Sequence, residues 1–267
     1  MPLVRSDRLG VGDEQATDGH LFSTRLSRSG RTLNMSFQAN QISPDFETDV
    51  GFVRRRDQRE ASGNASIRFW PTESVLVNWG PSVDYGRLYD FSEVLQDENL
   101  GAGINFSFIR NIGLSANLSR EMERFRGTEY ETSGFSVRGN VNAPQYSFGT
   151  NFSKGESLFF SEEIVGDSFR WSVNGSFRPT DQMQTGLNYT SSRLTDPRKQ
   201  DLELFNVKIV RSNTNVQFTE RLGFRSIVEY STQEETLDFN LLFQYQVNAG
   251  TVFFLGYDDH YQQADLI

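Results

Sequence analysis

The feature that most constrains this chain is an alternation of apolar and polar residues with a period of two, repeated along most of its length. Between Leu237 and Val247 every odd position is apolar, and four of the five residues between them are polar. Successive side chains of a β-strand point to opposite faces, so this pattern predicts a strand with one apolar and one polar face. No segment shows the period of an amphipathic helix.

About fourteen segments show this alternation, and many of them have ten residues or more. Strands of globular proteins usually have about 5–6 residues, whereas a strand that crosses a bilayer needs about 9–11 tilted residues. These segments are therefore long enough to cross a membrane. They lie at 20–28, 32–42, 61–70, 73–90, 98–110, 112–125, 129–142, 145–155, 167–178, 182–193, 202–219, 223–232, 236–247 and 250–261.

The composition of the two faces distinguishes two all-β folds. The polar face carries Asn, Ser, Gln, Thr and Arg rather than mostly Lys and Glu, and the apolar face is rich in Phe. A soluble sandwich would bury the Phe face between two sheets, whereas a membrane barrel would turn it to lipid and enclose the polar face in a lumen. The length and number of the segments favour a transmembrane antiparallel β-barrel with about 14 strands present. The alternative is a soluble β-sandwich or β-sheet protein that binds carbohydrate.

The links between the segments alternate between short and longer ones, as in outer-membrane barrels with short periplasmic turns and longer extracellular loops. Both the start of the first segment and the end of the last then lie outside, so we expect a fragment of a barrel of 16 or more strands. The predicted organisation is a polar N-terminal tail or loop at 1–19, a barrel domain at 20–262 and a truncated C-terminal loop at 263–267. The longer links are 43–60, 91–97, 126–128, 156–166, 194–201 and 233–235.

Composition excludes several classes of protein. The chain of 267 residues has no Cys, which excludes disulfides, thiolate metal sites and a cysteine nucleophile. Its formal charge of −9 argues against a nucleic-acid partner. Aromatic residues make up 13% of the chain, too many for a disordered acidic chain, and no apolar run reaches the roughly 18 residues of a membrane-spanning helix.

Three stretches resemble the C-terminal region of a bacterial family called domain of unknown function 5916. They are Ser43–Asp57, then Val216–Thr219 with Leu222–Tyr230, and Tyr245–Tyr257, the last with Asn248-Ala249-Gly250-Thr251 at its turn. The resemblance implies a secreted protein with an N-terminal carbohydrate-binding, family-9-like module followed by an outer-membrane β-barrel. That module is absent here, and Ile267 is not the terminal aromatic with which such barrels usually end. The family supplies no catalytic residues.

Charged residues on the polar face form the first candidate site. In a barrel they point into the lumen, where they could filter solutes or brace the wall as an Arg/Glu network. Arg outnumbers Lys by 23 to 3, which suits multi-donor pairing. The predicted lumen-lining residues are Arg25, Arg68, Glu121, Arg138, Arg170, Arg225 and Glu229.

Two further groups have both a functional and a structural interpretation. Asp45, Glu47 and Asp49 offer oxygen ligands for a loop cation, or they form a solvated loop that pairs with the arginines that follow. Aromatic residues near segment ends could stack on sugars, but membrane-interface girdles are the expected role. The predicted interfacial aromatics are Trp70, Trp79, Tyr85, Tyr89 and Tyr257. Phe159 and Phe160, in a long link, would fold inward as a plug or rest on the barrel rim.

Little in the sequence points to catalysis. Only His20 and His260 are present, and no nucleophile elbow, phosphate loop or zinc-protease motif occurs. We therefore predict no enzyme activity, catalytic residue, metal or cofactor. The predicted function is a passive, porin-like conduit, or a membrane anchor for an attached domain, in the outer membrane of a Gram-negative bacterium. The predicted partners are outer-membrane lipid, the barrel-assembly machinery and solutes such as polysaccharide, and nucleic acid is excluded.

Overall fold

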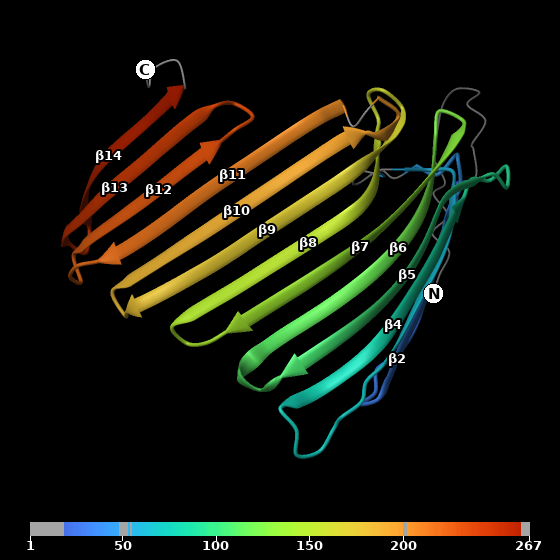
Figure 1. Ribbon diagram of the computed structural model, residues 1–267, viewed down its shortest axis with the longest axis horizontal. Coiled ribbons are helices and arrows are strands. Elements are labelled where there is room, and N and C mark those ends of the chain that lie inside the picture. Colours follow the sequence, from blue (N-terminus) through green and yellow to red (C-terminus); the bar gives the residue numbers. More distant parts are fainter. Residues whose placement is uncertain (1–18, 48–52, 54, 200–201, 263–267) are drawn as a thin grey trace, which may run out of the picture.

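The computed structural model describes residues 19–47, 53, 55–199 and 202–262, and the described residues fold into one antiparallel sheet. The sheet has fourteen strands whose order in space follows their order in the sequence. Each strand therefore pairs only with its sequence neighbours (Figure 1). The predicted all-β fold with about 14 antiparallel strands is confirmed.

The strands are long, and the longest has 17 residues. Two single-turn 3₁₀ helices lie in links, at Ile109–Asn111 and Pro197–Lys199. The strands are β1 (Leu21–Arg28), β2 (Leu33–Ile42), β3 (Gln58–Ile67), β4 (Leu76–Tyr89), β5 (Leu95–Phe108), β6 (Ile112–Phe125), β7 (Thr128–Asn142), β8 (Tyr146–Phe159), β9 (Ile164–Thr180), β10 (Met183–Asp196), β11 (Leu202–Gln217), β12 (Leu222–Ser231), β13 (Thr236–Asn248) and β14 (Thr251–Gln262).

Several links predicted to be long are shorter in the structure, because strand pairing continues past the point where the alternation of residues stops. Phe159 is the last residue of β8 and pairs with Ile164 of β9, so the predicted link 156–166 shrinks to 160–163. Phe159 is thus part of the sheet and not of a loop plug. Phe160 packs edge-to-face on Phe125, with ring centroids 5.1 Å apart, which is the predicted rim contact.

We call the end of the sheet that carries links 90–94, 126–127 and 160–163 the rim, and the opposite end the lower end; Figure 1 shows them at upper right and lower left. The tightest rim link is a two-residue turn with φ of 50° at Arg126 and 84° at Gly127. Positive φ at both central residues is the geometry of a type I′ turn, whose twist matches that of paired strands.

The sheet is curved and its two edges remain open. β1 and β14 lie at opposite edges, and no ladder pairs them in the described part of the chain (Figure 1). All eight residues of β1 and most residues of β14 are exposed. The fourteen strands therefore form a curved wall and not a closed cylinder.

The wall has almost no hydrophobic core. Among the described residues only Ile164 and Leu194 are buried hydrophobic residues, whereas thirty-nine large hydrophobic side chains are exposed, with Leu26 at 75% and Leu255 at 71%. A water-soluble fold would cover such a surface, because contiguous apolar patches on soluble monomers rarely exceed a few hundred Å². Within the described ranges, no helix has the length and apolar character needed to cross a membrane.

Candidate functional site

The candidate functional site is the whole two-faced wall, and the strand register shows how it is built. Directly opposed residues of an antiparallel pair point to the same side of the sheet. Arg25 is opposite Gln38, which is opposite Ser62, and the same row continues through Gly86, Asn99 and Glu121 to Thr132. The neighbouring rows on the other side bring apolar residues together in the same way. The period of two thus separates a polar face from an apolar face over all fourteen strands.

The apolar residues form a band that runs obliquely across the strands. A row that starts at Ile104, in the middle of the apolar run of β5, leaves the band by the time it reaches β10 and β11. On those strands the apolar residues, such as Leu187 and Val210, lie closer to the lower end. The rows run perpendicular to the strands. Because the apolar band is inclined to the rows, the strands do not cross the band at a right angle but are tilted, as in barrels whose strands tilt by about 35–45°. The row from Ile104 passes through Ala116, Val137, Phe152, Trp171, Ser191 and Lys208.

Most of the predicted lumen-lining residues lie on the polar face of their strands. Arg25 donates from Nε to Gln38 Oε1 at 3.1 Å. Arg138, Arg170, Arg225 and Glu121 lie in polar rows and form no ion pair within the described ranges. Arg68 differs, because it follows the end of β3 and its guanidinium lies 5.7 Å from the centroid of the Trp70 ring.

Glu229 belongs to a charged row that the sequence alone did not reveal. Its Oε2 lies 3.5 Å from Nη1 of Arg211 on β11, and its register partner on β13 is Asp238, which pairs with His260 of β14. Four consecutive strands thus present Arg, Glu, Asp and His side by side. Side chains of opposite sign thus lie next to one another on neighbouring strands, and Arg211, Asp238 and His260 become visible as members of this row only once the register is known.

Charges of opposite sign occupy different sectors of the polar face. On β3–β6 the charged residues of this face within the strands are all acidic, namely Glu60, Asp84, Asp97, Glu121 and Glu123. On β7–β11 they are Arg138, Arg170, Arg178 and Arg211, apart from Asp196 at the upper end of β10. A chain with a formal charge of −9 therefore carries a basic sector on one part of its wall.

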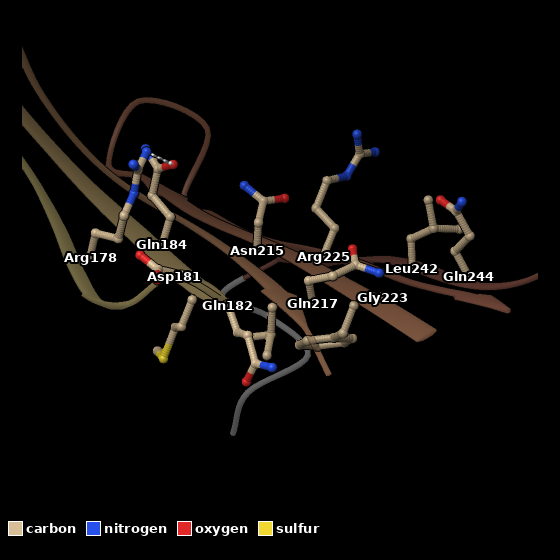
Figure 2. A pocket seen from close by; sticks show the side chains of 13 residues that line it. Arg178, Asp181, Gln182, Gln184, Asn215, Gln217, Gly223, Arg225, Leu242 and Gln244 are labelled. Carbon is tan, nitrogen blue, oxygen red and sulfur yellow. Dashed lines mark hydrogen bonds between the residues drawn. The ribbon is translucent and has the colours of Figure 1, made fainter. Parts of the chain in front are cut away.

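A polar cavity of 520 Å³ lies at the lower end of the wall across β9–β13, and it extends from the basic sector onto β12 and β13. Figure 2 shows Arg178, Gln184, Asn215, Arg225 and Gln244 standing on the same side of the sheet. Arg178 donates to Gln184 Oε1 at 3.1 Å. The other three side chains form no hydrogen bond within the described residues, so their donors face open space.

Gly223 forms the floor of this cavity. It lies between Gln217 and Gln244 in one cross-strand row. A Cβ at this position would approach Gln217 Oε1 to 3.1 Å, so a larger residue would require the end of the Gln217 side chain to shift slightly. A second cavity of 380 Å³ has similar chemistry, since it is lined by Arg138 together with Asn140, Asn142, Asn151 and Asn174.

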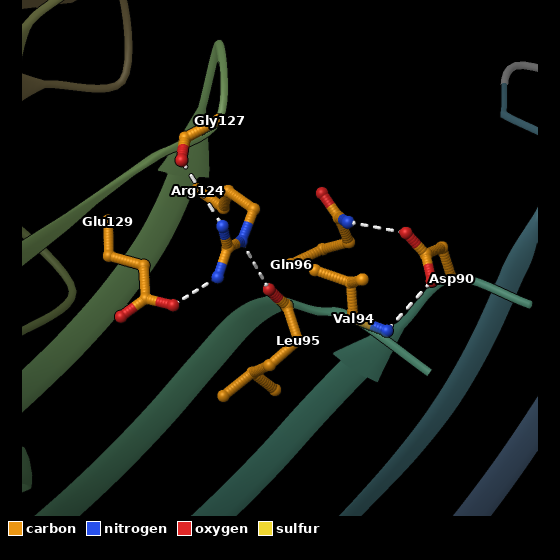
Figure 3. Close-up of polar contacts among 7 residues, drawn as sticks. All are labelled: Asp90, Val94, Leu95, Gln96, Arg124, Gly127 and Glu129. Atoms are coloured by element: carbon orange, nitrogen blue, oxygen red, sulfur yellow. Dashed lines mark hydrogen bonds and ion pairs between the residues drawn. The ribbon is translucent and has the colours of Figure 1, made fainter. Parts of the chain in front are cut away.

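The rim is held together by side-chain contacts of a different kind. Arg124 donates from Nε to the Leu95 carbonyl at 2.9 Å and from Nη1 to the Gly127 carbonyl at 3.2 Å, and it pairs with Glu129 (Figure 3). One guanidinium thus ties β5, the 126–127 turn and β7 together. In the adjacent link 90–94, Asp90 Oδ1 accepts a hydrogen bond from Val94 N at 2.9 Å.

Asp196 fixes another part of the rim. Its side chain has no exposed surface and accepts hydrogen bonds from Arg198 N at 3.0 Å and Arg198 Nε at 3.1 Å. These bonds to the Arg198 side chain and backbone hold the pKa of the Asp196 carboxyl below its ordinary value.

The predicted interfacial aromatics lie toward both ends of the apolar band. At the lower end, Trp79 stacks on Phe69 with centroids 4.6 Å apart, and Trp70 donates from Nε1 to the Arg31 carbonyl at 3.1 Å. Toward the rim, Tyr85 donates to Glu98 Oε1 at 2.6 Å, and Tyr89 accepts from Arg87 at 3.4 Å. Tyr257 of β14 donates to Asp259 Oδ2 at 2.5 Å.

The acidic trio lies only partly within the described residues, so its cation site stays a prediction. Glu47 lies 3.5 Å from Arg56 Nη1, which also donates to the Phe46 carbonyl, and Asp49 lies outside the described residues. Nowhere within the described ranges do three or more His, Cys, Asp or Glu residues come together as metal ligands.

Comparison with known proteins finds a similar structure but no family. No protein-family model matches the chain, and no curated protein matches it. Among solved structures the chain is similar to OmpT (folded in vitro), an outer membrane protein of Vibrio cholerae, at 11% identity and a TM-score of 0.38. The match covers 91% of this chain and 85% of that chain. The resemblance to domain of unknown function 5916 stays a prediction.

Proposed function

We propose that this chain forms the wall of a bacterial outer-membrane β-barrel that acts as a passive, porin-like conduit for solutes. The observation that carries the proposal is the uncovered apolar band. Among all described residues, thirty-nine large hydrophobic side chains are exposed and only Ile164 and Leu194 are buried hydrophobic residues. Lipid is the solvent that such a band requires, and a transmembrane barrel pairs it with a polar interior. The partners are then outer-membrane lipid and the barrel-assembly machinery.

The soluble alternative lacks the second layer that it needs. A β-sandwich covers its apolar face with a second sheet packed about 10 Å away. The described residues form a single sheet, and their apolar face has no such cover. A carbohydrate-binding sandwich is therefore the weaker proposal.

The wall needs further strands to close. An unpaired strand edge in hydrocarbon leaves backbone N–H and C=O groups without partners, at several kcal/mol per group. β1 and β14 each present such an edge, so we propose closure by at least two more strands, giving 16 or more. Cysteines at Ser23 and Asp258 of the full-length protein, both on the polar face, test this. Efficient disulfide formation between them would mean a closed 14-strand barrel instead.

The predicted wall residues acquire roles within this proposal. Arg25, Arg138, Arg170 and Arg225 face the lumen, while Trp79, Tyr85 and Tyr257 mark the two membrane interfaces. Polar rows with unpaired Arg and Asn side chains support an aqueous conduit over a barrel that only anchors another domain.

Reconstitution of the full-length protein tests both parts of the proposal. A membrane barrel will need detergent or lipid to remain monodisperse and will migrate differently on gels before and after heating. A monodisperse protein in plain buffer would reject the membrane assignment. Planar bilayers then separate conduit from anchor: discrete conductance steps support the conduit, and a folded but silent barrel rejects it in favour of the anchor.

A further inference from the structure

We propose that the lower-end cavity lined by Arg178 and Arg225 is a binding site for small oxyanion-bearing solutes, which carry a carboxylate or a phosphate. The inference rests on the proposed conduit, because it assumes that this face lines an aqueous lumen. It adds a solute class, which neither the fold nor the comparison with known structures supplies.

The first support is the state of the donors around the cavity. The guanidinium of Arg225 and the amides of Asn215 and Gln244 have no hydrogen-bond partner in the described part of the chain, and all three face the cavity (Figure 2). Arg178 commits only one of its N–H groups, to Gln184. A guanidinium offers several donors in a planar fork that matches the two oxygens of a carboxylate or phosphate. The site therefore has unused donors of the geometry that an oxyanion accepts.

The second support is the charge around the site. Two arginines and one acid, Asp181, line the cavity, so its lining is basic. Arg138, Arg170 and Arg211 on the polar face of β7–β11 add positive charge, against Asp196 at the rim and Glu229 on β12. A concave surface whose walls carry an excess of one sign of charge focuses the field and raises the local concentration of counter-ions. The positive charge thus attracts anions, and the unpaired donors can bind them.

The third support is the space and the lack of an aromatic platform. The cavity measures 520 Å³, which suits a small solute, and its lining includes Gly223, which carries no side chain, between Gln217 and Gln244. Phe224 is the one aromatic residue of the lining, and its ring packs on Phe243, on the opposite face of the sheet. Neutral sugars would find no exposed ring to stack on, so the lining favours charged solutes over polysaccharide.

The test uses the full-length protein in planar bilayers under a KCl gradient. We expect a reversal potential that reports preference for chloride, and block of the chloride current by inorganic phosphate or succinate added on the lower-end side. The double variant Arg178→Gln/Arg225→Gln should lower the chloride-to-potassium permeability ratio by about threefold or more and abolish the block. Stronger block by phosphate than by succinate, or the reverse, identifies which oxyanion the site prefers.

Arg221→Gln is the matched control. Arg221 is exposed in the 218–221 link, four residues from Arg225, and does not line the cavity, so its loss should leave the block unchanged. Arg225→Lys keeps the charge without the planar fork and should retain ion preference while weakening the block. Unaltered heat-modifiable migration of each variant shows that the barrel has folded.

The outcomes separate this inference from the proposed conduit. Wild-type channels that prefer potassium, or a double variant with unchanged block, overturn the anion site and leave the conduit standing. If the wild-type barrel is silent, the conduit fails. Phosphate binding to the protein in detergent, measured by ³¹P line broadening, then tests the site alone. Broadening that the double variant loses supports the site, and equal broadening in both overturns it.

Discussion

The middle of the wall and its rim belong to the same strands but are stabilised in different ways. In the middle, Val137 and its apolar neighbours are exposed on one face, and cross-strand backbone pairing holds the strands together. At the rim, side chains make specific bonds, and Arg124 alone joins two strands and a turn. The stability of the middle therefore depends on the solvent that contacts its apolar face, whereas the stability of the rim depends on individual hydrogen bonds and ion pairs. Substitutions should expose this difference.

The largest effect is expected from a charge placed in the middle of the apolar face. Val137→Arg should lower the free energy of unfolding by about 2–4 kcal/mol, the cost of Arg on a lipid-facing barrel position near the bilayer midplane. Urea titration of the protein folded in lipid vesicles measures it. Ser136→Arg places the same group on the opposite, polar face and should cost far less. Equal costs for the two variants would contradict the assignment of the two faces.

The next largest effect is expected at the rim, from loss of Arg124. Arg124→Gln removes two bonds to carbonyls and one ion pair, and hydrogen bonds from a charged group are worth about 1.5–3 kcal/mol. The same urea titration measures the loss. The control is Arg120→Gln, because Arg120 pairs with Glu131 where both side chains are well exposed, and it should change stability much less. Arg124 would not be the tie proposed if the two variants were indistinguishable.

A smaller effect is expected from the aromatic contact at the rim. Phe160→Ala removes the edge-to-face contact with Phe125, and such contacts are worth about 0.5–1.5 kcal/mol beyond the area buried. Phe218→Ala is the matched control, since Phe218 is 49% exposed against 48% for Phe160 and has no ring partner among the described residues. Thermal unfolding in detergent compares the pair, and a larger loss from the control would reject the contact.

The smallest effect is expected from acidification of the rim. The pKa of Asp196 is lowered in the folded state, so its contribution to stability is present above the ordinary carboxyl pKa and is lost as the pH falls through the lowered value. Urea midpoints measured from about pH 5 down to about pH 2 should therefore fall more steeply for the wild type than for Asp196→Asn. Parallel pH profiles of the wild type and Asp196→Asn would show that the Arg198 contact adds nothing to stability.

The same contrast explains which features could be predicted from the sequence. All fourteen strands were predicted, because each has to present one face to an apolar and one to a polar surrounding, and this leaves a period of two in the residues. Rim contacts leave no such period in the sequence. Arg124 donates to the backbone carbonyls of Leu95 and Gly127, and because every residue has a backbone carbonyl, the sequence does not reveal which ones accept. The Arg211–Glu229 pair and the cavity over Gly223 depend on register, which alternation alone does not determine. Phe159 was placed in a loop because pairing at the rim continues where the alternation ends.

The strictly sequential strand order has a consequence for how such walls change in size. Because no strand pairs outside its sequence neighbours, a hairpin can be added or removed without rerouting any other connection. Each added hairpin widens the sheet, measured perpendicular to the strands, by two strand spacings, about 9–10 Å. The wall is thus a modular strip, which duplication of a short gene segment would widen while existing pairings stay intact.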